Sequence, residues 1–174
     1  MRQLFVKDDD FSLEKPFSFF NRPGDAEYHL EQYQDNGTAY LVLLNQKKEM
    51  IGKVSKETAK GRPRYVGMTS VGEELFLLRQ EKTDELEGFV FSSPVFELCG
   101  QWWECNYDVM YGYRKVAKIR KRWVHWGLSR EITLFEEQSE LFTLLLVAAF
   151  LYLENEKNNN NALYFIEEKE RANL

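Results

Sequence analysis

The sequence predicts a mainly β protein, a closed antiparallel barrel of about twelve strands around one buried hydrophobic C-terminal helix. Three observations predict this fold class. The chain of 174 residues contains 13 Phe, 9 Tyr and 4 Trp, and aromatic side chains favour strands. Short aromatic and β-branched runs, cut by turn residues, recur as far as about residue 135. An almost wholly apolar run then follows near the C-terminus.

The expected strands recur at the spacing of about 8–12 residues that is typical of an all-β sandwich or barrel. After a first strand at the N-terminus, they cover residues 17–21, 27–33, 38–44, 50–55, 64–68, 75–78, 89–91, 95–99, 102–109, 116–123 and 128–135. The dipeptide Asn36-Gly37 separates two of these runs. Such a pair is typical of the tight turn of a β-hairpin, because both residues tolerate a positive φ.

The apolar run at residues 141–153 predicts a helix over about 139–154. Ser139 precedes the run, where its hydroxyl can accept a hydrogen bond from a free backbone N–H at the start of a helix. As a helix, the apolar run at residues 141–153 extends about 20 Å, whereas the hydrocarbon core of a bilayer is about 30 Å thick. We therefore expect a buried core helix that does not span a membrane. A helix that is apolar on every face must be covered on every face, and a closed barrel does this.

Length and composition indicate one domain, with the barrel over residues 1–155 and a polar linker and tail over residues 156–174. The first residues contain no apolar stretch long enough for a secretory signal. We therefore expect a cytoplasmic protein, able to associate with a membrane surface. Cys99 and Cys105 are then expected to be free thiols with a structural role, because their spacing matches no zinc or redox pattern.

The motifs of catalysis are absent from the sequence. His29 and His125 are far apart in the chain, and neither belongs to a metal-binding, phosphate-binding or nucleophile motif. The acidic run at residues 8–10 is interpreted as a solvated turn, because no partner motif for a cation accompanies it. We predict that the protein is not an enzyme and has no cofactor and no metal site. The net charge of −5 excludes a wholly basic nucleic-acid binder, and no nucleic-acid partner is expected.

The most distinctive stretch, residues 111–130, contains seven basic residues and no acidic one. In a strand, Lys118, Arg120 and Arg122 would project from one face. Such a row could meet phosphates of lipid headgroups, with tryptophans at the bilayer interface. The candidate anion-binding residues are Arg114, Lys118, Arg120, Lys121 and Arg122. The candidate interface aromatics are Trp123 and Trp126. The alternative is a solvated barrel face that acidic neighbouring strands neutralise, with the tryptophans in core or rim packing.

Several blocks of sequence resemble the LURP-one-related branch of the tubby C-terminal-like superfamily, especially its small bacterial members. The resemblance covers about residues 1–155. The matching blocks are Leu4-Phe5-Val6-Lys7, Phe11-Ser12-Leu13, Phe17-Ser18-Phe19-Phe20, the basic strand at residues 116–123, Trp126-Gly127 and the apolar helix at residues 141–153. The resemblance implies a closed barrel of about twelve strands around a hydrophobic helix. Relatives in the superfamily include phosphoinositide-binding tubby domains and phospholipid scramblases.

Two functions are consistent with these features. The first is a non-enzymatic cytoplasmic binding module that recognises anionic lipid headgroups, or an acidic partner, through the basic strand at residues 114–122. The second is a protein-interaction or structural barrel with no small-molecule ligand. The expected partners are thus an anionic membrane surface or another protein, and the sequence does not choose between them.

Overall fold

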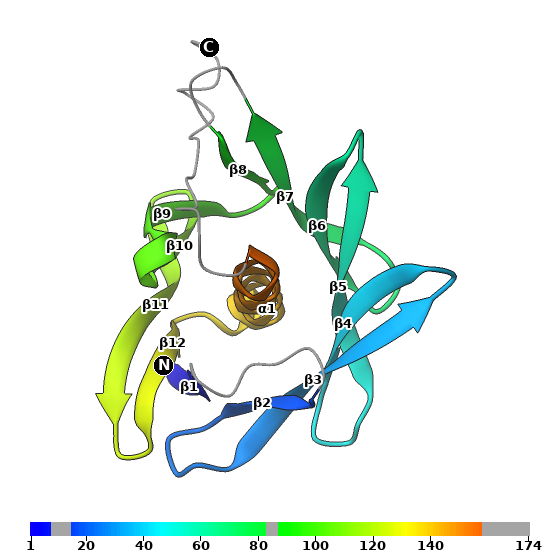
Figure 1. Ribbon diagram of the computed structural model, residues 1–174. Coiled ribbons are helices and arrows are strands. Elements are labelled where there is room, and N and C mark those ends of the chain that lie inside the picture. The colour runs from blue at the N-terminus through cyan, green and yellow to red at the C-terminus, as the bar shows by residue number, and fades with distance from the viewer. Residues whose placement is uncertain (8–14, 83–86, 158–174) are drawn as a thin grey trace.

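The computed structural model describes residues 1–7, 15–82 and 87–157, and it contains twelve strands and one α-helix (Figure 1). The strands are β1 (Arg2–Lys7), β2 (Phe17–Phe20), β3 (Ala26–Asp35), β4 (Thr38–Leu44), β5 (Met50–Ala59), β6 (Arg62–Thr69), β7 (Glu74–Lys82), β8 (Glu87–Ser92), β9 (Glu97–Gln101), β10 (Asn106–Tyr111), β11 (Arg114–Val124) and β12 (Gly127–Leu134). The helix α1 (Glu140–Lys157) follows a 3-10 turn, Glu137–Ser139. The expected linker and tail, and the acidic run at residues 8–10, lie outside the described residues.

One antiparallel sheet contains all twelve strands, in the order β8-β7-β6-β5-β4-β3-β2-β1-β12-β11-β10-β9. The sheet curls around α1, as Figure 1 shows when the molecule is viewed along the helix. The prediction of a mainly β barrel around a C-terminal helix is confirmed. The turn at Asn36-Gly37 is confirmed as well, because Asn36 has a φ of 49° and Gly37 a φ of 81°.

The barrel is nearly closed. Strands β8 and β9, at the two ends of the sheet, do not pair with each other in the described part of the chain. Aromatic rings pack where that pairing is missing, since the ring centroids of Phe96 and Phe142 are 4.5 Å apart. Phe91 meets Phe142 at 6.1 Å, and Trp102 stacks on Phe150 at 4.9 Å. Side-chain packing therefore replaces the last row of backbone hydrogen bonds.

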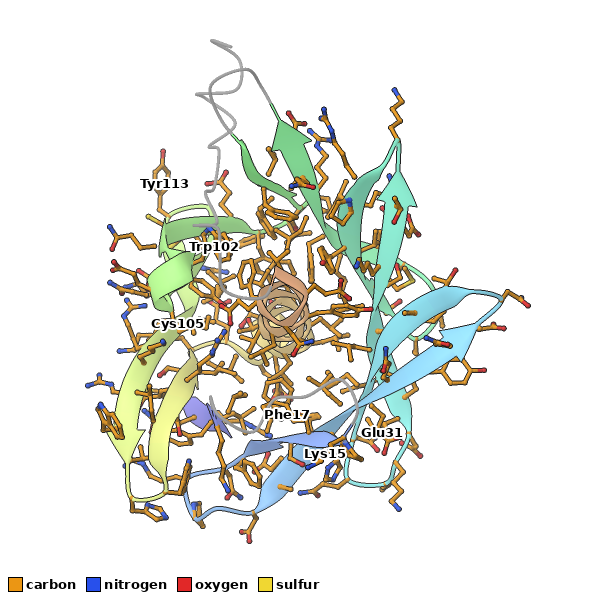
Figure 2. All side chains as sticks on the ribbon, viewed as in Figure 1. Lys15, Phe17, Glu31, Trp102, Cys105 and Tyr113 are labelled. Carbon is orange, nitrogen blue, oxygen red and sulfur yellow. The ribbon has the colours of Figure 1, made fainter. Side chains whose placement is uncertain are left out.

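The helix is buried on every face, as its sequence predicts. Residues 142–153 are all buried, and side chains fill the space between α1 and the sheet (Figure 2). Removing this much apolar surface from water is the dominant stabilisation of such a fold, at about 25 cal/mol for each Å². The interior is thus filled by the protein itself, so a ligand of this barrel has to bind outside it.

Charged side chains hold the two ends of the helix against the barrel wall. Near the first turn, Arg2 Nε lies 3.0 Å from Glu140 Oε1. Near the last turns, the guanidinium of Arg130, 7% exposed as a residue, pairs with Glu154. Breaking a buried pair of this kind by removing one partner is strongly destabilising, because it leaves a charge without compensation.

Three local details differ from the sequence expectations. Trp102 does not belong to a strand over 102–109, because Trp102–Glu104 form a 3-10 turn that Cys105 closes with a φ of 53°. The helix extends to Lys157, three residues beyond the expected end. Ser139 lies in the 3-10 turn before the helix, and its hydroxyl is a hydrogen-bond donor there, to the carbonyl oxygens of Val116 and Glu136 at 3.2 and 2.8 Å.

Candidate functional site

Strand β11 carries the basic residues that the sequence singled out, and its two faces differ. Ala117 and Ile119 are completely buried and belong to the core around α1. Because side chains alternate along a strand, Lys118, Arg120 and Arg122 project from the opposite, outer face. Lys121 shares the parity of Ile119 and is exposed. The predicted row of three cations therefore exists on the outer wall of the barrel.

Most cations of β11 are already paired with carboxylates. Arg120 Nη2 lies 2.7 Å from Asp108 Oδ1, and Arg120 Nη1 donates to two backbone carbonyl oxygens at 2.8 Å each. Lys115 Nζ lies 2.8 Å from the other oxygen of Asp108. Arg114 Nε lies 3.3 Å from Glu136 Oε1. The guanidinium of Arg120 is therefore already bonded within the protein. Arg114 lies at the other end of the strand and pairs with a different carboxylate.

The carboxyl group of Asp108 is the centre of this pairing. Burial, the largest single influence, raises its pKa, but hydrogen bonds from Lys115 and Arg120 and the charges of both cations act in the opposite direction. Together they outweigh burial and lower the pKa from its ordinary value. The carboxylate therefore stays ionised and neutralises this part of the strand.

Lys118 is the exception on the outer face. It lies directly opposite Asp108 in the ladder between β11 and β10, yet Lys115 and Arg120 are the cations that contact Asp108. Lys118 makes no ion pair with the described residues, and its Nζ lies 5.9 Å from the centre of the Phe135 ring. Arg122 has a loose partner, with 3.6 Å between its Nε and Glu131 Oε1. Lys118 and Arg122 are thus the cations of this row that are most available to a ligand.

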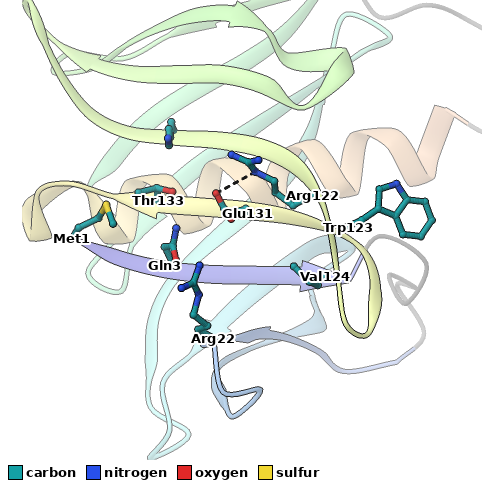
Figure 3. A pocket seen from close by; sticks show the side chains of 9 residues that line it. Met1, Gln3, Arg22, Arg122, Trp123, Val124, Glu131 and Thr133 are labelled. Atoms are coloured by element: carbon teal, nitrogen blue, oxygen red, sulfur yellow. Dashed lines mark ion pairs between the residues drawn. The ribbon is translucent and has the colours of Figure 1, made fainter.

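A groove of about 430 Å³ runs beside these two residues across β11, β12 and β1 (Figure 3). We call it the outer groove. Its basic lining residues are Lys118, Arg122 and Arg22, and the carboxylate of Glu131 also lines it. Further lining residues are Met1, Gln3, Trp123, Val124 and Thr133. The charged side chains sum to two positive charges, so the groove favours an anion.

Thr133 gives the outer groove a specific feature. The residue is 1% exposed, and its hydroxyl has no hydrogen-bond partner among the described residues. In the sheet, Thr133 lies between Lys118 of β11 and Gln3 of β1. Buried polar atoms nearly always have a partner, and a ligand oxygen above Thr133 would supply one. The unpaired hydroxyl therefore lies beside an uncompensated cation.

A second groove, of about 410 Å³, lies on the other side of β11. Lys118 and Arg122 line both grooves, and Arg120 and Lys121 line this one. Glu104, Cys105 and Asn106 form its other wall. The structure therefore brings four of the five candidate anion-binding residues together, and the fifth, Arg114, lines neither groove.

The two candidate aromatics have different environments. Trp123 is 80% exposed and lines the outer groove, and it projects from the end of β11 in Figure 3. Trp126 packs edge-on against Phe5 at 5.6 Å, and its Nε1 donates to Ser129 at 2.8 Å. Trp123 is placed to contact a partner, whereas Trp126 stabilises the rim of the sheet.

Sequence reasoning missed six residues that line the outer groove: Met1, Gln3, Arg22, Val124, Glu131 and Thr133. Met1, Gln3 and Arg22 are far from β11 in sequence, and the strand order brings them near it because β12 lies between β1 and β11. Glu131 and Thr133 belong to β12, which follows β11 in the chain and pairs with it. For Glu131 and Thr133, the alternation within β12 was a usable signal, because these residues share the outer face with Ser129. Nothing in the sequence marks Arg22 or Gln3.

The described residues contain no group of three or more His, Cys, Asp or Glu side chains placed to hold a metal ion. Cys99 and Cys105 are free thiols, the first exposed and the second buried. Within the described ranges, no helix has the length and apolar character needed to cross a membrane.

A sheet wrapped around one hydrophobic helix, with its charged grooves outside, defines a class of helix-filled β-barrels. A family model described as LURP-one-related matches residues 2–151, and the chain belongs to this family. It is similar to "Uncharacterized protein YxjI" of Bacillus subtilis (strain 168), with 20% identity over 161 residues that cover 92% of this chain and 99% of that protein. No solved structure matches the chain significantly.

Proposed function

We propose that this protein is a non-enzymatic binding module that recognises phosphate-bearing lipid headgroups at a membrane surface through the outer groove. The observation that carries the proposal is the adjacency of Lys118 and Thr133: among the described residues, Lys118 has no ion pair and the buried hydroxyl of Thr133 has no hydrogen-bond partner. A phosphate oxygen can accept a hydrogen bond from the Thr133 hydroxyl while the ammonium group of Lys118 compensates the phosphate charge. The family match is consistent with a binding role.

The geometry of the outer groove suits a headgroup. Arg122 can leave its loose contact with Glu131, because an ion pair of 3.6 Å on a side chain that is 55% exposed contributes little. A guanidinium then offers two parallel N–H groups to a phosphate. Arg22 comes from the turn between β2 and β3 and makes no ion pair with the described residues. Three cations from two parts of the chain thus converge on one groove.

Trp123 supports a membrane as the source of the anion. Trp123 is 80% exposed and lines the outer groove, so its ring is accessible to a partner that occupies the groove. Its amphipathic ring suits the headgroup level of a bilayer, where tryptophan is enriched. The protein would therefore dock with β11 and its hairpin towards the lipid, and it would not need to insert a helix.

The proposal is tested by co-sedimentation with vesicles of phosphatidylcholine containing about one third phosphatidylglycerol, at low salt. We expect the wild-type protein to sediment with these vesicles and not with pure phosphatidylcholine. The Lys118→Gln/Arg122→Gln variant should lose most of this binding, whereas Lys47→Gln/Lys48→Gln, a matched change in an exposed turn, should retain it. Circular dichroism checks that the variants are folded. Absent wild-type binding, or equal binding by all three proteins, would contradict the proposal and leave the protein-interaction barrel as the better account.

A further inference from the structure

A second basic cluster lies on the opposite side of the barrel, at the hairpin that joins β5 to β6. A groove of about 290 Å³ there is lined by Lys60, Arg62, Pro63, Arg64, Arg79 and Gln80. Six strands separate β6 from β11 in one direction around the sheet. Figure 1 accordingly places β6 and β11 on opposite sides of α1. We call this site the hairpin groove, and it shares no lining residue with the outer groove.

The backbone explains why a groove opens at this place. Strand β6 pairs with β5 as far as Arg62, but it pairs with β7 only from Arg64 onward. Pro63 stands between these two positions and has no N–H to donate to a ladder. The β6 strand therefore extends beyond its pairing with β7, and Arg62 lies next to a part of β7 to which it is not bonded.

The charges of the hairpin groove are only partly compensated. Arg64 and Arg79 lie directly opposite each other in the ladder, an arrangement of like charges that is destabilising by itself. Glu57 pairs with Arg64 at 2.7 Å, and Glu81 pairs with Arg79 at 3.0 Å. The remaining cations, Lys60 and Arg62, make no ion pair with the described residues.

We infer that the hairpin groove binds a phosphate group carried by a soluble molecule. Two uncompensated cations match the charge of a phosphate monoester or a diphosphate, and the facing arginines would be relieved of repulsion by an anion between them. Guanidinium groups from β6 and β7 can each offer a fork of N–H donors to the same phosphate.

The size and lining of the groove favour a soluble ligand over a lipid. Its volume lies near the lower end of the range for small-molecule pockets, which begins at about 300 Å³. None of the described residues that line it is aromatic, whereas Trp123 lines the outer groove. A barrel that docks on a membrane through β11 would also hold this hairpin away from the bilayer. This last point alone rests on the proposed function, and the charge argument does not.

The test uses pyrophosphate as the probe and amide chemical shifts in ¹⁵N–¹H correlation spectra as a site-resolved readout. We expect pyrophosphate at millimolar concentration and low salt to shift the amides of Gly61, Arg62 and Arg79. The Lys60→Asn/Arg62→Gln variant should bind at least tenfold more weakly. Asn suits position 60, whose φ is 53°. Neither side chain belongs to an ion pair with described residues, so the variant should keep its fold, and Lys47→Gln serves as the matched control.

Three results would overturn the inference. The first is that the amide shifts of the hairpin stay unchanged at about 10 mM pyrophosphate, because a site that is empty at this concentration binds too weakly to be useful. The second is equal binding by the wild type and the double variant. The third is a hairpin that responds to anionic vesicles and not to pyrophosphate, which would favour a lipid ligand. Amide shifts report on Arg62 and Lys118 separately. A negative result at the hairpin groove is therefore distinguishable from a negative result at the outer groove.

Discussion

The two basic regions of this barrel look alike in composition and differ in how their charges are compensated. On β11, Asp108 pairs with both Lys115 and Arg120, whereas Lys118 has no ion pair within the described part of the chain. At the hairpin groove, neither Lys60 nor Arg62 has an ion pair with a described residue. The number of basic residues in a strand therefore does not give the number of cations that a ligand can reach. That number depends on how many of these cations pair with carboxylates on neighbouring strands.

Charge reversal should produce the largest difference between the two regions. Lys118→Glu/Arg122→Glu changes the outer groove by four charge units, and each unit contributes about 1 kcal/mol near an anionic membrane. We expect the affinity for anionic vesicles to fall by more than about 100-fold. Lys60→Glu/Arg62→Glu makes the same formal change on the opposite side, and it should alter vesicle affinity by less than about threefold. Equal losses in the two variants would mean that binding follows net charge alone.

Removing the carboxylate that neutralises two cations of β11 should make the outer face of β11 resemble the hairpin groove, where two cations have no ion pair with described residues. Asp108→Asn removes the carboxylate that pairs with Lys115 and Arg120. Because hydrogen bonds to charged groups are lost at a partly buried site, we expect the free energy of unfolding to fall by about 1.5 kcal/mol. The affinity for anionic vesicles should rise by about fivefold, because the strand gains one net positive charge. Denaturant unfolding and co-sedimentation measure the two effects, and a fall in affinity would contradict the account.

A change at Thr133 should separate stability from binding. Thr133→Val removes a buried hydroxyl that has no hydrogen-bond partner among the described residues, so the free energy of unfolding should rise by about 1 kcal/mol. The ligand would lose one hydrogen bond, and the affinity for anionic vesicles should fall by about fivefold. Opposite signs are the expected signature of a binding hydroxyl. If stability falls as well, Thr133 contributes to packing instead.

The smallest effect should be a pH dependence of stability. The pKa of Asp108 is lowered in the folded protein, so its contribution to stability is fully present above the ordinary pKa of aspartate, about 3.9. That contribution is lost as the pH falls through the lowered folded value, because protonation then removes the pairing with Lys115 and Arg120. The stability difference between the wild type and Asp108→Asn should therefore shrink as the pH falls from 5 towards 2. A constant difference would contradict this role of Asp108.

Much of the fold follows from the sequence because its signals are local. The aromatic and β-branched runs, the Asn36-Gly37 turn and the apolar run at residues 141–153 each specify one element. The 3-10 turn at Trp102–Glu104 is different, because Trp102 lies outside the strands and stacks on Phe150 of α1. That contact is tertiary, and no local sequence pattern predicts it. The role of Ser139 likewise depends on Val116, which is distant in sequence.

The site was predicted less completely, because its contacts join residues that are distant in sequence. Alternation along β11 correctly placed Lys118, Arg120 and Arg122 on one face. It could not show that Asp108 compensates Arg120, because that pairing depends on the register between β10 and β11. The hairpin groove was missed although residues 60, 62 and 64 alternate in the same way. Its fourth cation, Arg79, comes from a different strand and enters only through the ladder.

The orientation of the barrel on a membrane tests the central claim most directly, through quenching of tryptophan fluorescence by vesicles of brominated anionic phospholipid. Trp123 is 80% exposed beside the outer groove, whereas Trp102 is buried. We predict strong quenching of the wild-type protein and much weaker quenching of Trp123→Phe, measured at concentrations where both are bound. Equal quenching of the two proteins, or no quenching of the bound wild type, would contradict the claim that the β11 face meets the lipid.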